Sequence, residues 1–455
     1  MYYRNLATTW ADRALSYPGR QRTQTMRRSP GHPRLAVGIS VIAILAVGGT
    51  AAGCTAAAPA GTTVRSVSGR GPITFATGKL GSGYLPSLVA QWNAAHPRQR
   101  VTVIYLPADA DEQHAQLVEN LQARSDVYDV MNLDVIWTAE FASNGWISPV
   151  SPRLAPLSQF LRPAVTTATY DGRLWAVPFT SNAGLLYYRK DLVPTPPRTW
   201  AQLERDAETI APRHHMPGYA GQFAAYEGLT VNFAEAVQSA GGSILSSSGS
   251  RATLTSPQAR RALGFLVSGF AQGWIPRAAL GWDEEASRRA FEDGRLLFLR
   301  NWPYVYADAA TPGHGNKVAG KFGVTTLPGP DGSGSSSLGG GNLAVSAFSQ
   351  HPATALAFIR FLTSLPSERR VLIDTSLPPV WTRLYTEPAL IRRFPYLPVL
   401  KRAILAARPR PQIASYNQLS LAISSAVHRA LAQQVPVTQT LTSLGSQLNQ
   451  ILRKS

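Results

Sequence analysis

Residues 72–106 read PITFATGKLGSGYLPSLVAQWNAAHPRQRVTVIYL, and this stretch decides the fold. Residues 72–77 have the alternation of a β-strand and end at Gly78. The apolar residues of 85–95 recur with helical spacing, and 101–106 is an apolar run with the length of a buried strand. Strand, helix and strand at this spacing predict a βαβ unit with a parallel sheet.

The same patterns continue along the chain and predict an α/β fold without internal repeats. Residues 175–179 and 184–189 read as a strand pair, and the Gly/Ser-rich stretch 329–341 reads as a break between strands. Asp134 follows a predicted parallel strand, where open α/β sheets present ligand-binding residues. The remaining predicted elements are helices at 113–123, 199–211, 227–240, 256–272 and 352–365, strands at 128–133, 322–327 and 342–347, and a mostly helical section from about 418.

Composition indicates a globular protein with room for two lobes. The chain has 455 residues, of which 44% are hydrophobic and 15% charged, and it contains 10 Trp and 16 Tyr. A low charged fraction with many aromatic rings suits a site that recognises neutral ligands by shape.

The net charge of +18 is unevenly placed: residues 1–53 carry seven Arg against one Asp, whereas the remaining charge is scattered. No block of five or six like charges occurs, whereas a nucleic-acid-binding protein concentrates its charge on one face. The charge therefore favours a basic surface near an anionic cell envelope over a nucleic-acid partner.

The beginning of the chain predicts export. A basic stretch precedes residues 35–47 (LAVGISVIAILAV), which have the length of a signal-peptide core, and small residues then lead to Cys54, the one cysteine. This segment resembles a bacterial lipobox, although Ala51 stands where Leu is usual, and implies that Cys54 is lipidated. The alternative is an uncleaved anchor with an idle cysteine. Residues 55–71 read as a flexible tether, and translation starting at Met26 would leave the first 25 residues without a function.

Four local patterns stand out along 72–455: 128–141 (YDVMNLDVIWTAEF), 176–190 (AVPFTSNAGLLYYRK), 298–304 (FLRNWPY) with 322–328 (FGVTTLP), and 338–345 (LGGGNLAV). In this order they resemble the sugar-binding proteins of ABC importers, and most closely the actinobacterial trehalose-binding lipoproteins.

This resemblance implies a two-lobed periplasmic-binding-protein fold, in which a multi-strand hinge joins two α/β lobes and the ligand lies in the cleft between them. By analogy the chain passes between lobes near 178–182, 324–328 and 370–377. The implied organisation is an N-terminal extension with signal peptide (1–53), the lipidated Cys and tether (54–71), lobe 1 (72–180 and 327–375) and lobe 2 (181–326 and, as a C-terminal helical part, 376–455).

A sugar site needs carboxylates, amides or guanidinium groups for the hydroxyls and aromatic rings for the C–H faces. Asp134 matches the family's position at a strand end; its alternative role is to cap the turn that begins at Val135. Asn182 lies in the first predicted passage and is suited to bind a hydroxyl, or is simply a turn residue.

Further candidates come from the resemblance. Trp302 matches the family's stacking aromatic, with core packing as the alternative. Gly340 and Gly341 look like a loop whose backbone approaches the ligand, with a purely flexible loop as the alternative. Asp111 and Arg410 occupy places where relatives contact sugar.

Glu227 is a candidate carboxylate from the second lobe. The alternative is a Glu in the first turn of a helix, where the helix dipole favours it.

Together these features predict a lipid-anchored, extracellular solute-binding protein that captures a disaccharide and delivers it to an ABC permease. Trehalose is the first ligand expected, and maltose or another α-linked glucoside the second. We expect a monomer without cofactor or metal. A glycoside-active enzyme would need a pair such as Asp134 and Glu227 as acid and base, and a carbohydrate sensor could use the same fold. No HExxH, GxSxG or Walker A pattern occurs.

Overall fold

The structure is a computed structural model that describes residues 69–79, 82–313 and 315–454. The predicted signal peptide, Cys54 and nearly all of the predicted tether lie outside the described residues. Within the described ranges, no helix is both long and apolar enough to cross a membrane. The described residues all belong to one compact unit with its own hydrophobic core.

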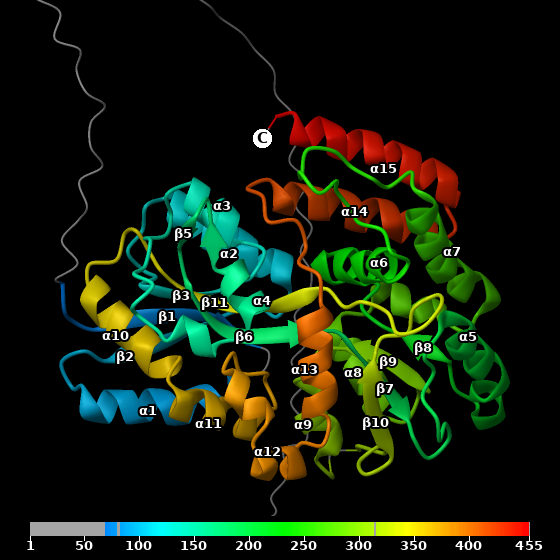
Figure 1. Ribbon diagram of the computed structural model, residues 1–455, viewed down its shortest axis with the longest axis horizontal. Coiled ribbons are helices and arrows are strands. Elements are labelled where there is room, and N and C mark those ends of the chain that lie inside the picture. Colours follow the sequence, from blue (N-terminus) through cyan, green and yellow to red (C-terminus); the bar gives the residue numbers. More distant parts are fainter. Residues whose placement is uncertain (1–68, 80–81, 314, 455) are drawn as a thin grey trace, which may run out of the picture. The chain divides into compact units, whose positions relative to one another are not determined.

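A five-stranded sheet, in the order β2-β1-β3-β11-β6, forms the centre of the first lobe (Figure 1). β1 runs parallel to both β2 and β3, and α1 connects β1 to β2. The βαβ unit predicted from residues 72–106 is therefore confirmed. Because parallel strands end at one edge, Gly78 and Asp134 lie at the same edge of this sheet. The bounds are β1 (Ile73–Gly78), α1 (Leu85–Ala95), β2 (Val101–Leu106), β3 (Val130–Asp134), β6 (Val177–Ala183) and β11 (Leu338–Val345).

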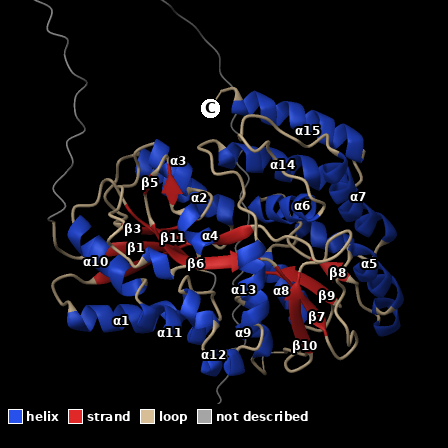
Figure 2. Ribbon diagram, viewed as in Figure 1, coloured by secondary structure: helices blue, strands red, loops and turns tan. Residues whose placement is uncertain are grey.

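Helices cover both faces of the first sheet (Figure 2). In that view α1 lies on one side, and α2 (Ala110–Gln122) and α3 (Thr138–Ser143) lie on the other. The core beneath α1 is aromatic: Phe358 lies 5.7 Å from Phe75 and 5.4 Å from Trp92, measured between ring centroids. Edge contacts between rings of this kind stabilise a core beyond the area they bury.

The second lobe is built on a four-stranded sheet in the order β10-β7-β9-β8. β7 is antiparallel to β9 and β10, and β8 is parallel to β9. Helices α6, α7 and α14 pack on one another beside this sheet (Figure 1). The predicted two-lobed α/β fold is thus confirmed. The bounds are β7 (Leu185–Arg189), β8 (Tyr219–Ala220), β9 (Phe298–Asn301), β10 (Phe322–Thr326), α6 (Glu227–Ser239), α7 (Pro257–Gln272) and α14 (Tyr416–Leu431).

The predicted strand pair at 175–179 and 184–189 is wrong, because β6 and β7 belong to different sheets. The chain changes sheet at Gly184, whose backbone N–H donates to Ser336 Oγ. A Cβ at Gly184 would lie 2.4 Å from Glu235 Oε1, so only glycine fits at this passage. The sequence shows two neighbouring strand patterns but not that the second one pairs elsewhere.

Two further passages join the lobes. Between β10 and β11 the chain returns to the first sheet, and after α11 (Leu365–Thr375) it runs along the end of β6, where Ser181 N–H donates to Pro378 O over 3.2 Å. Further along, the chain forms α13 (Leu397–Ala406), which packs against both β6 and β10.

The Gly-rich stretch is also more regular than predicted. β11 begins at Leu338, so Gly340 and Gly341 are strand residues and not a loop. They pair with Ser181 and Thr180 of β6, and a bulge follows between Gly341 and Asn342. Glycine is required for this close approach, because a Cβ at Gly340 would lie 2.1 Å from Thr180 O. Asn182 likewise lies within β6 and not in a turn.

The remaining elements are short or peripheral. The helices are α4 (Arg162–Thr167), α5 (Trp200–Thr209), α8 (Glu284–Glu292), α9 (Val305–Ala310), α10 (Pro352–Leu362), α12 (Pro388–Arg393) and α15 (Val437–Leu452). The other strands are β4 (Thr169–Tyr170) and β5 (Arg173–Leu174), and the short 3-10 helices are η1 (Ser82–Tyr84), η2 (Leu157–Gln159), η3 (Ala211–His214), η4 (Arg277–Gly281) and η5 (Thr382–Tyr385).

We expect Gly340→Ala to lower the free energy of unfolding by about 3 kcal/mol, because the new methyl group meets the β6 backbone and the residue has a φ of +129°. Urea unfolding measures the change. Gly264→Ala in α7 is the control: a Cβ there meets nothing within 4 Å, so this change should stabilise the protein by about 0.5–1 kcal/mol. Equal effects of the two substitutions would contradict this explanation.

Candidate ligand-binding site

A cavity of about 190 Å³ lies at the edge of the first sheet where β1 and β3 end. Four residues predicted as ligand-binding line it: Asp134, Asn182, Gly340 and Gly341. Other lining residues come from β1, η1, α2, β3, β6 and the start of α3, so most of its wall belongs to the first lobe. They include Thr77, Gly78, Tyr84, Gln113, Asn132, Trp137 and Thr180.

Asp134 is the last residue of β3, and its side chain is 27% exposed. Its Oδ1 accepts hydrogen bonds from the Ile136 backbone N–H and from Arg410 Nη2, both over 3.2 Å. The two roles considered for Asp134 therefore coexist, because it caps the local turn and also forms an ion pair that reaches the second lobe.

Arg410 lies between α13 and α14 and joins Asp134 to Glu227. Its side chain is only 2% exposed, and its Nη1 donates to Glu227 Oε1. Its Nη2 also donates to Leu338 O at the start of β11, over 3.4 Å. One guanidinium thus connects carboxylates from β3 and α6.

Glu227 is the first residue of α6, which confirms the alternative that it lies in the first turn of a helix. Its carboxylate is nevertheless buried among polar partners. Besides Arg410, it accepts hydrogen bonds from Tyr416 Oη (2.8 Å) and Ser420 Oγ, both on α14. Burial raises the pKa of the Glu227 carboxyl, and the charge of Arg410 opposes that rise. Sequence reasoning missed Tyr416 and Ser420, because nothing in a helical stretch marks which of its polar residues face another helix.

Trp302 follows β9 and is half-buried. Its indole N–H donates to Glu284 Oε1 over 3.3 Å, and Glu284 also accepts from Tyr226 Oη. A Cβ at Gly339 would lie 3.0 Å from the indole ring, so the ring reaches β11 from the second lobe. Glu284 was missed as well; its place after Asp283, the N-cap of α8, reads from sequence as an ordinary acidic helix start.

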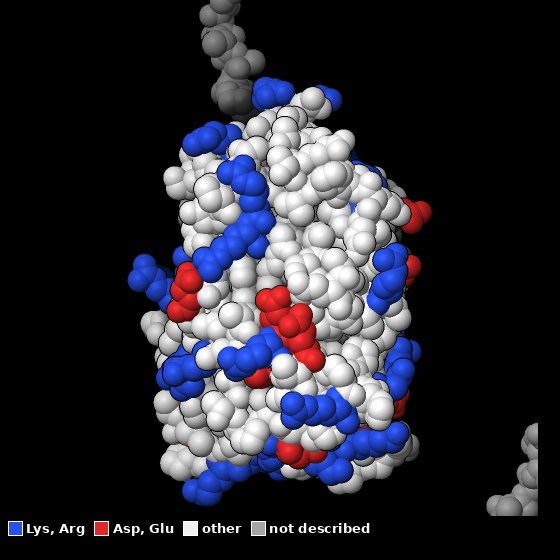
Figure 3. All heavy atoms as spheres, turned by 90° about the vertical axis from the view of Figure 1, so that its right-hand side faces the viewer, with Lys and Arg blue, Asp and Glu red and all other residues white. Residues whose placement is uncertain are grey.

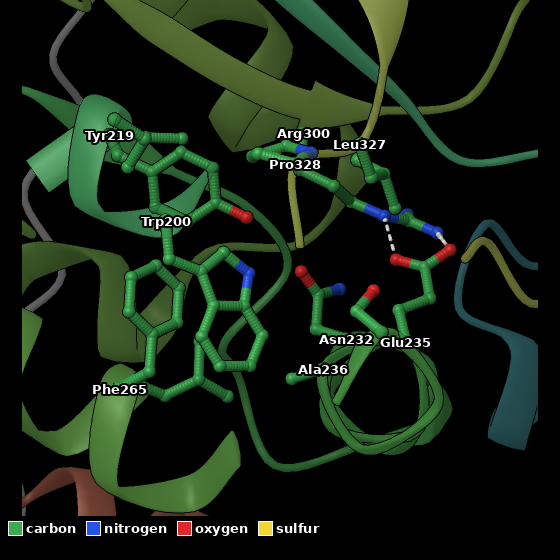
Figure 4. Close-up of a pocket in the computed structure, with 12 residues that line it drawn as sticks. Trp200, Tyr219, Asn232, Glu235, Ala236, Phe265, Arg300, Leu327 and Pro328 are labelled. Atoms are coloured by element: carbon green, nitrogen blue, oxygen red, sulfur yellow. Dashed lines mark hydrogen bonds and ion pairs between the residues drawn. The ribbon is translucent and has the colours of Figure 1, made fainter. Parts of the chain in front are cut away.

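Arg300 supports the indole from within the second lobe. Its guanidinium carbon lies 4.1 Å from the centroid of the Trp302 ring, a cation–π contact. The same guanidinium makes two 2.7 Å hydrogen bonds to Glu235 on α6, drawn as dashed lines in Figure 4. The adjoining cavity in Figure 4 has a volume of about 30 Å³, room for roughly two waters, so this region supports the site but is too small for a sugar.

Several buried polar atoms near the cavity have no hydrogen-bond partner within the described residues. They are Asn132 Oδ1, Asn182 Oδ1 and Arg410 Nε. A buried polar atom left without a partner costs about 1–3 kcal/mol, so such atoms are normally satisfied by water or ligand. Asn132 and Asn182 line the cavity, so water or a ligand inside it is placed to supply the partners that their amide oxygens lack.

Asp111 lies in the first turn of α2, with Asp109 as N-cap. Burial, followed by the charges of Glu227 and Asp109, raises the pKa of Asp111 from 3.8 to about 7. The backbone of Glu227 hydrogen-bonds this carboxyl, so the first turns of α2 and α6 face each other across the lobes.

The structure brings all eight predicted side chains and glycines into one neighbourhood. Asp111, Glu227, Arg410 and Asp134 form one chain of contacts, and Trp302 reaches the strand that carries Gly340 and Gly341, beside Asn182. No group of three or more His, Cys, Asp or Glu suited to hold a metal occurs among the described residues. The arrangement is thus suited to bind a polyhydroxylated ligand through hydrogen bonds and one aromatic face.

We expect Asp111→Asn to stabilise the protein increasingly as the pH rises from 4 to 8. The pKa of this carboxyl is higher in the folded protein than in the unfolded protein. Wild-type stability is therefore greatest below the pKa of the unfolded state and falls until the pH has passed the pKa of the folded state, whereas Asn stays neutral throughout. A rise from 3.8 to about 7 corresponds to roughly 4 kcal/mol, which solvent screening reduces to about 2 kcal/mol at pH 8.

Urea unfolding of both proteins across this pH range measures the difference. Asp126→Asn, at an exposed position, is the control and should shift stability by less than about 0.5 kcal/mol at every pH. A stability difference between Asp111→Asn and wild type that does not vary with pH would contradict the prediction.

Known proteins of similar sequence show the family to which the chain belongs. Residues 78–367 match the family described as bacterial extracellular solute-binding protein. A "Probable ABC transporter-binding protein" of Deinococcus radiodurans is 33% identical over 396 residues, which cover 83% of this chain and 93% of that protein.

Solved structures give the same result. Maltose-bound T. maritima MalE3 is 32% identical, with a TM-score of 0.79 over 84% of this chain and 99% of that one. A solute-binding protein of Thermotoga lettingae with bound alpha-D-tagatose shares the fold at 23% identity and a TM-score of 0.77. The chain therefore belongs to the bacterial extracellular solute-binding proteins, a family of binding proteins and not of enzymes.

Proposed function

We propose that this protein is the sugar-binding component of an ABC importer and that it captures a disaccharide between its lobes. Trehalose is the first candidate, and maltose or another α-linked glucoside the second. In this proposal the protein is a monomer held at the extracellular face of the cell membrane by a lipid on Cys54, and it delivers the sugar to the permease. The maltose bound to a relative of 32% identity supports a glucoside.

One observation carries the proposal: polar groups that line the cavity are joined to polar groups of the second lobe through Arg410, and an indole of the second lobe lies against β11 at Gly339. Asp134 and Asn182 come from the first sheet, whereas Glu227 and Trp302 come from the second lobe. Carboxylates and amides suit vicinal hydroxyls, and an indole suits the C–H face of a pyranose ring. Gly340 and Gly341 contribute backbone alone, which lets a ring approach the sheet closely.

Arg410 gives the site its response to ligand. It pairs with both Asp134 and Glu227. A sugar whose hydroxyls hydrogen-bond these carboxylates therefore changes the ion pairs that join the lobes. The ligand shifts the balance between open and closed lobes only by its preference for one of them. Asp111 faces Glu227 at the same place and completes the set of proposed ligand-binding residues.

A carbohydrate sensor is the alternative to an import protein. The two differ only in the protein that the closed, sugar-bound form contacts, which for import is the permease. Uptake of labelled sugar, in cells with and without the protein, distinguishes the two: a sensor leaves uptake unchanged.

We expect Trp302→Ala and Asp134→Asn each to weaken disaccharide binding by roughly 10- to 100-fold, through loss of the aromatic face and of a charged hydrogen-bond acceptor. Isothermal titration with trehalose, maltose and sucrose measures the dissociation constants. Unfolding should remain cooperative in both variants.

Two matched variants control for size and charge. Trp175→Ala removes another half-buried indole, which bonds Tyr170 O outside the cavity, and Asp191→Asn removes a carboxylate of 31% exposure that pairs with Arg189. Neither should change the dissociation constant more than about two-fold. Unaltered affinity in both Trp302→Ala and Asp134→Asn would refute this site, and release of glucose during titration would refute a binding role.

A further inference from the structure

A second hollow, of about 370 Å³, lies on the first lobe and shares no lining residue with the ligand cavity. Three exposed arginines line it: Arg70, Arg153 on the turn after β3 and α3, and Arg360 on α10. The rest of the lining is Ser151 and the apolar residues Leu154, Ala353, Leu356 and Ala357, so it contains no acidic residue.

None of these three arginines forms an ion pair with any residue that the structure describes. On the side of the second lobe that Figure 3 shows, acidic side chains lie among the basic ones, and Arg261, for example, pairs with Asp331 over 3.1 Å. Other exposed arginines of that lobe, such as Arg213, have no ion pair among the described residues, but they do not line this hollow. The hollow is therefore a local concentration of uncompensated positive charge with an apolar floor.

The chain enters the described body at the rim of this hollow. Gly69 O accepts a hydrogen bond from Ala353 N–H over 3.1 Å, and Gly71 N–H donates to Thr354 Oγ1 over 3.2 Å. Arg70 lies between these two attachments to α10. Even fully extended, the chain from Cys54 to Gly69 spans at most about 50 Å. A lipid on Cys54 would thus keep the hollow close to the membrane.

We propose that this arginine hollow binds the phosphate of anionic phospholipid headgroups, so that the tethered protein rests with this part of the first lobe on the outer surface of the membrane. Guanidinium groups bind phosphate oxygens in pairs, and the apolar floor accommodates the glycerol end of a lipid. Each arginine close to an anionic bilayer strengthens binding by roughly five-fold. The proposal adds an interaction surface to the sugar-binding role, and its test does not depend on Cys54 or on sugar binding.

The test uses residues 64–455, the compact unit that carries the described core, without the lipid anchor. Sedimentation with vesicles of phosphatidylglycerol and phosphatidylcholine, compared with phosphatidylcholine alone, measures binding. We expect the triple substitution of Arg70, Arg153 and Arg360 to Gln to weaken binding to the anionic vesicles by roughly 100-fold, with trehalose or maltose affinity unchanged. Raising the salt concentration should weaken wild-type binding in the same direction.

A control triple of Arg213, Arg277 and Arg402 to Gln removes the same charge from exposed arginines that also lack an ion pair within the described residues. It should weaken vesicle binding less than about five-fold. If both triple variants lose vesicle binding equally, net charge alone explains the binding, and the proposal is overturned. Wild-type binding to the anionic vesicles that is no stronger than binding to phosphatidylcholine alone would likewise overturn the proposal.

Discussion

The guanidinium of Arg410 is the contact on which the site depends, because it holds Asp134 of the first sheet and Glu227 of α6 at once. Neither carboxylate has another cation among the described residues that pairs with it. The desolvation of such buried charges offsets much of their attraction, so the network contributes little net stability. What it does fix is geometry: with Arg410 in place, Glu227 is held beside the Asp134 that lines the cavity, and without it two carboxylates would be left without a cation between them.

The second lobe surrounds this contact with residues whose task is support. Tyr416 and Ser420 hold the carboxylate of Glu227, and Glu284 orients the indole of Trp302. Beneath that indole, the buried pair of Arg300 and Glu235 keeps a cation against one face of the ring. Preorganisation of this kind reduces the rotational freedom that ligand binding would otherwise have to remove.

Much of the fold could be predicted from the sequence, because the strands and helices of residues 72–106 are local patterns with strict periodicity. The pairing of β6 and β7 with different sheets could not be predicted, since it depends on contacts of Gly184 with Ser336 and Glu235 far along the chain. Asp134 could be identified because it follows a strand pattern and matches the family's position there, and Trp302 because it matches the family's stacking aromatic. Tyr416, Ser420 and Glu284 could not, because helical periodicity tells which face is apolar but not which polar group meets a partner.

The near-contact between Gly339 and the Trp302 ring ties two positions that are 37 residues apart to a common volume. A Cβ at 339 would lie 3.0 Å from the ring, so an alanine there requires the indole to move by a few tenths of an ångström. A larger side chain at 339 would require a smaller ring at 302. Across homologous sequences this should appear as covariation between 302 and 339, with the size of the pair, and not of either residue alone, setting how wide a ligand the protein accepts.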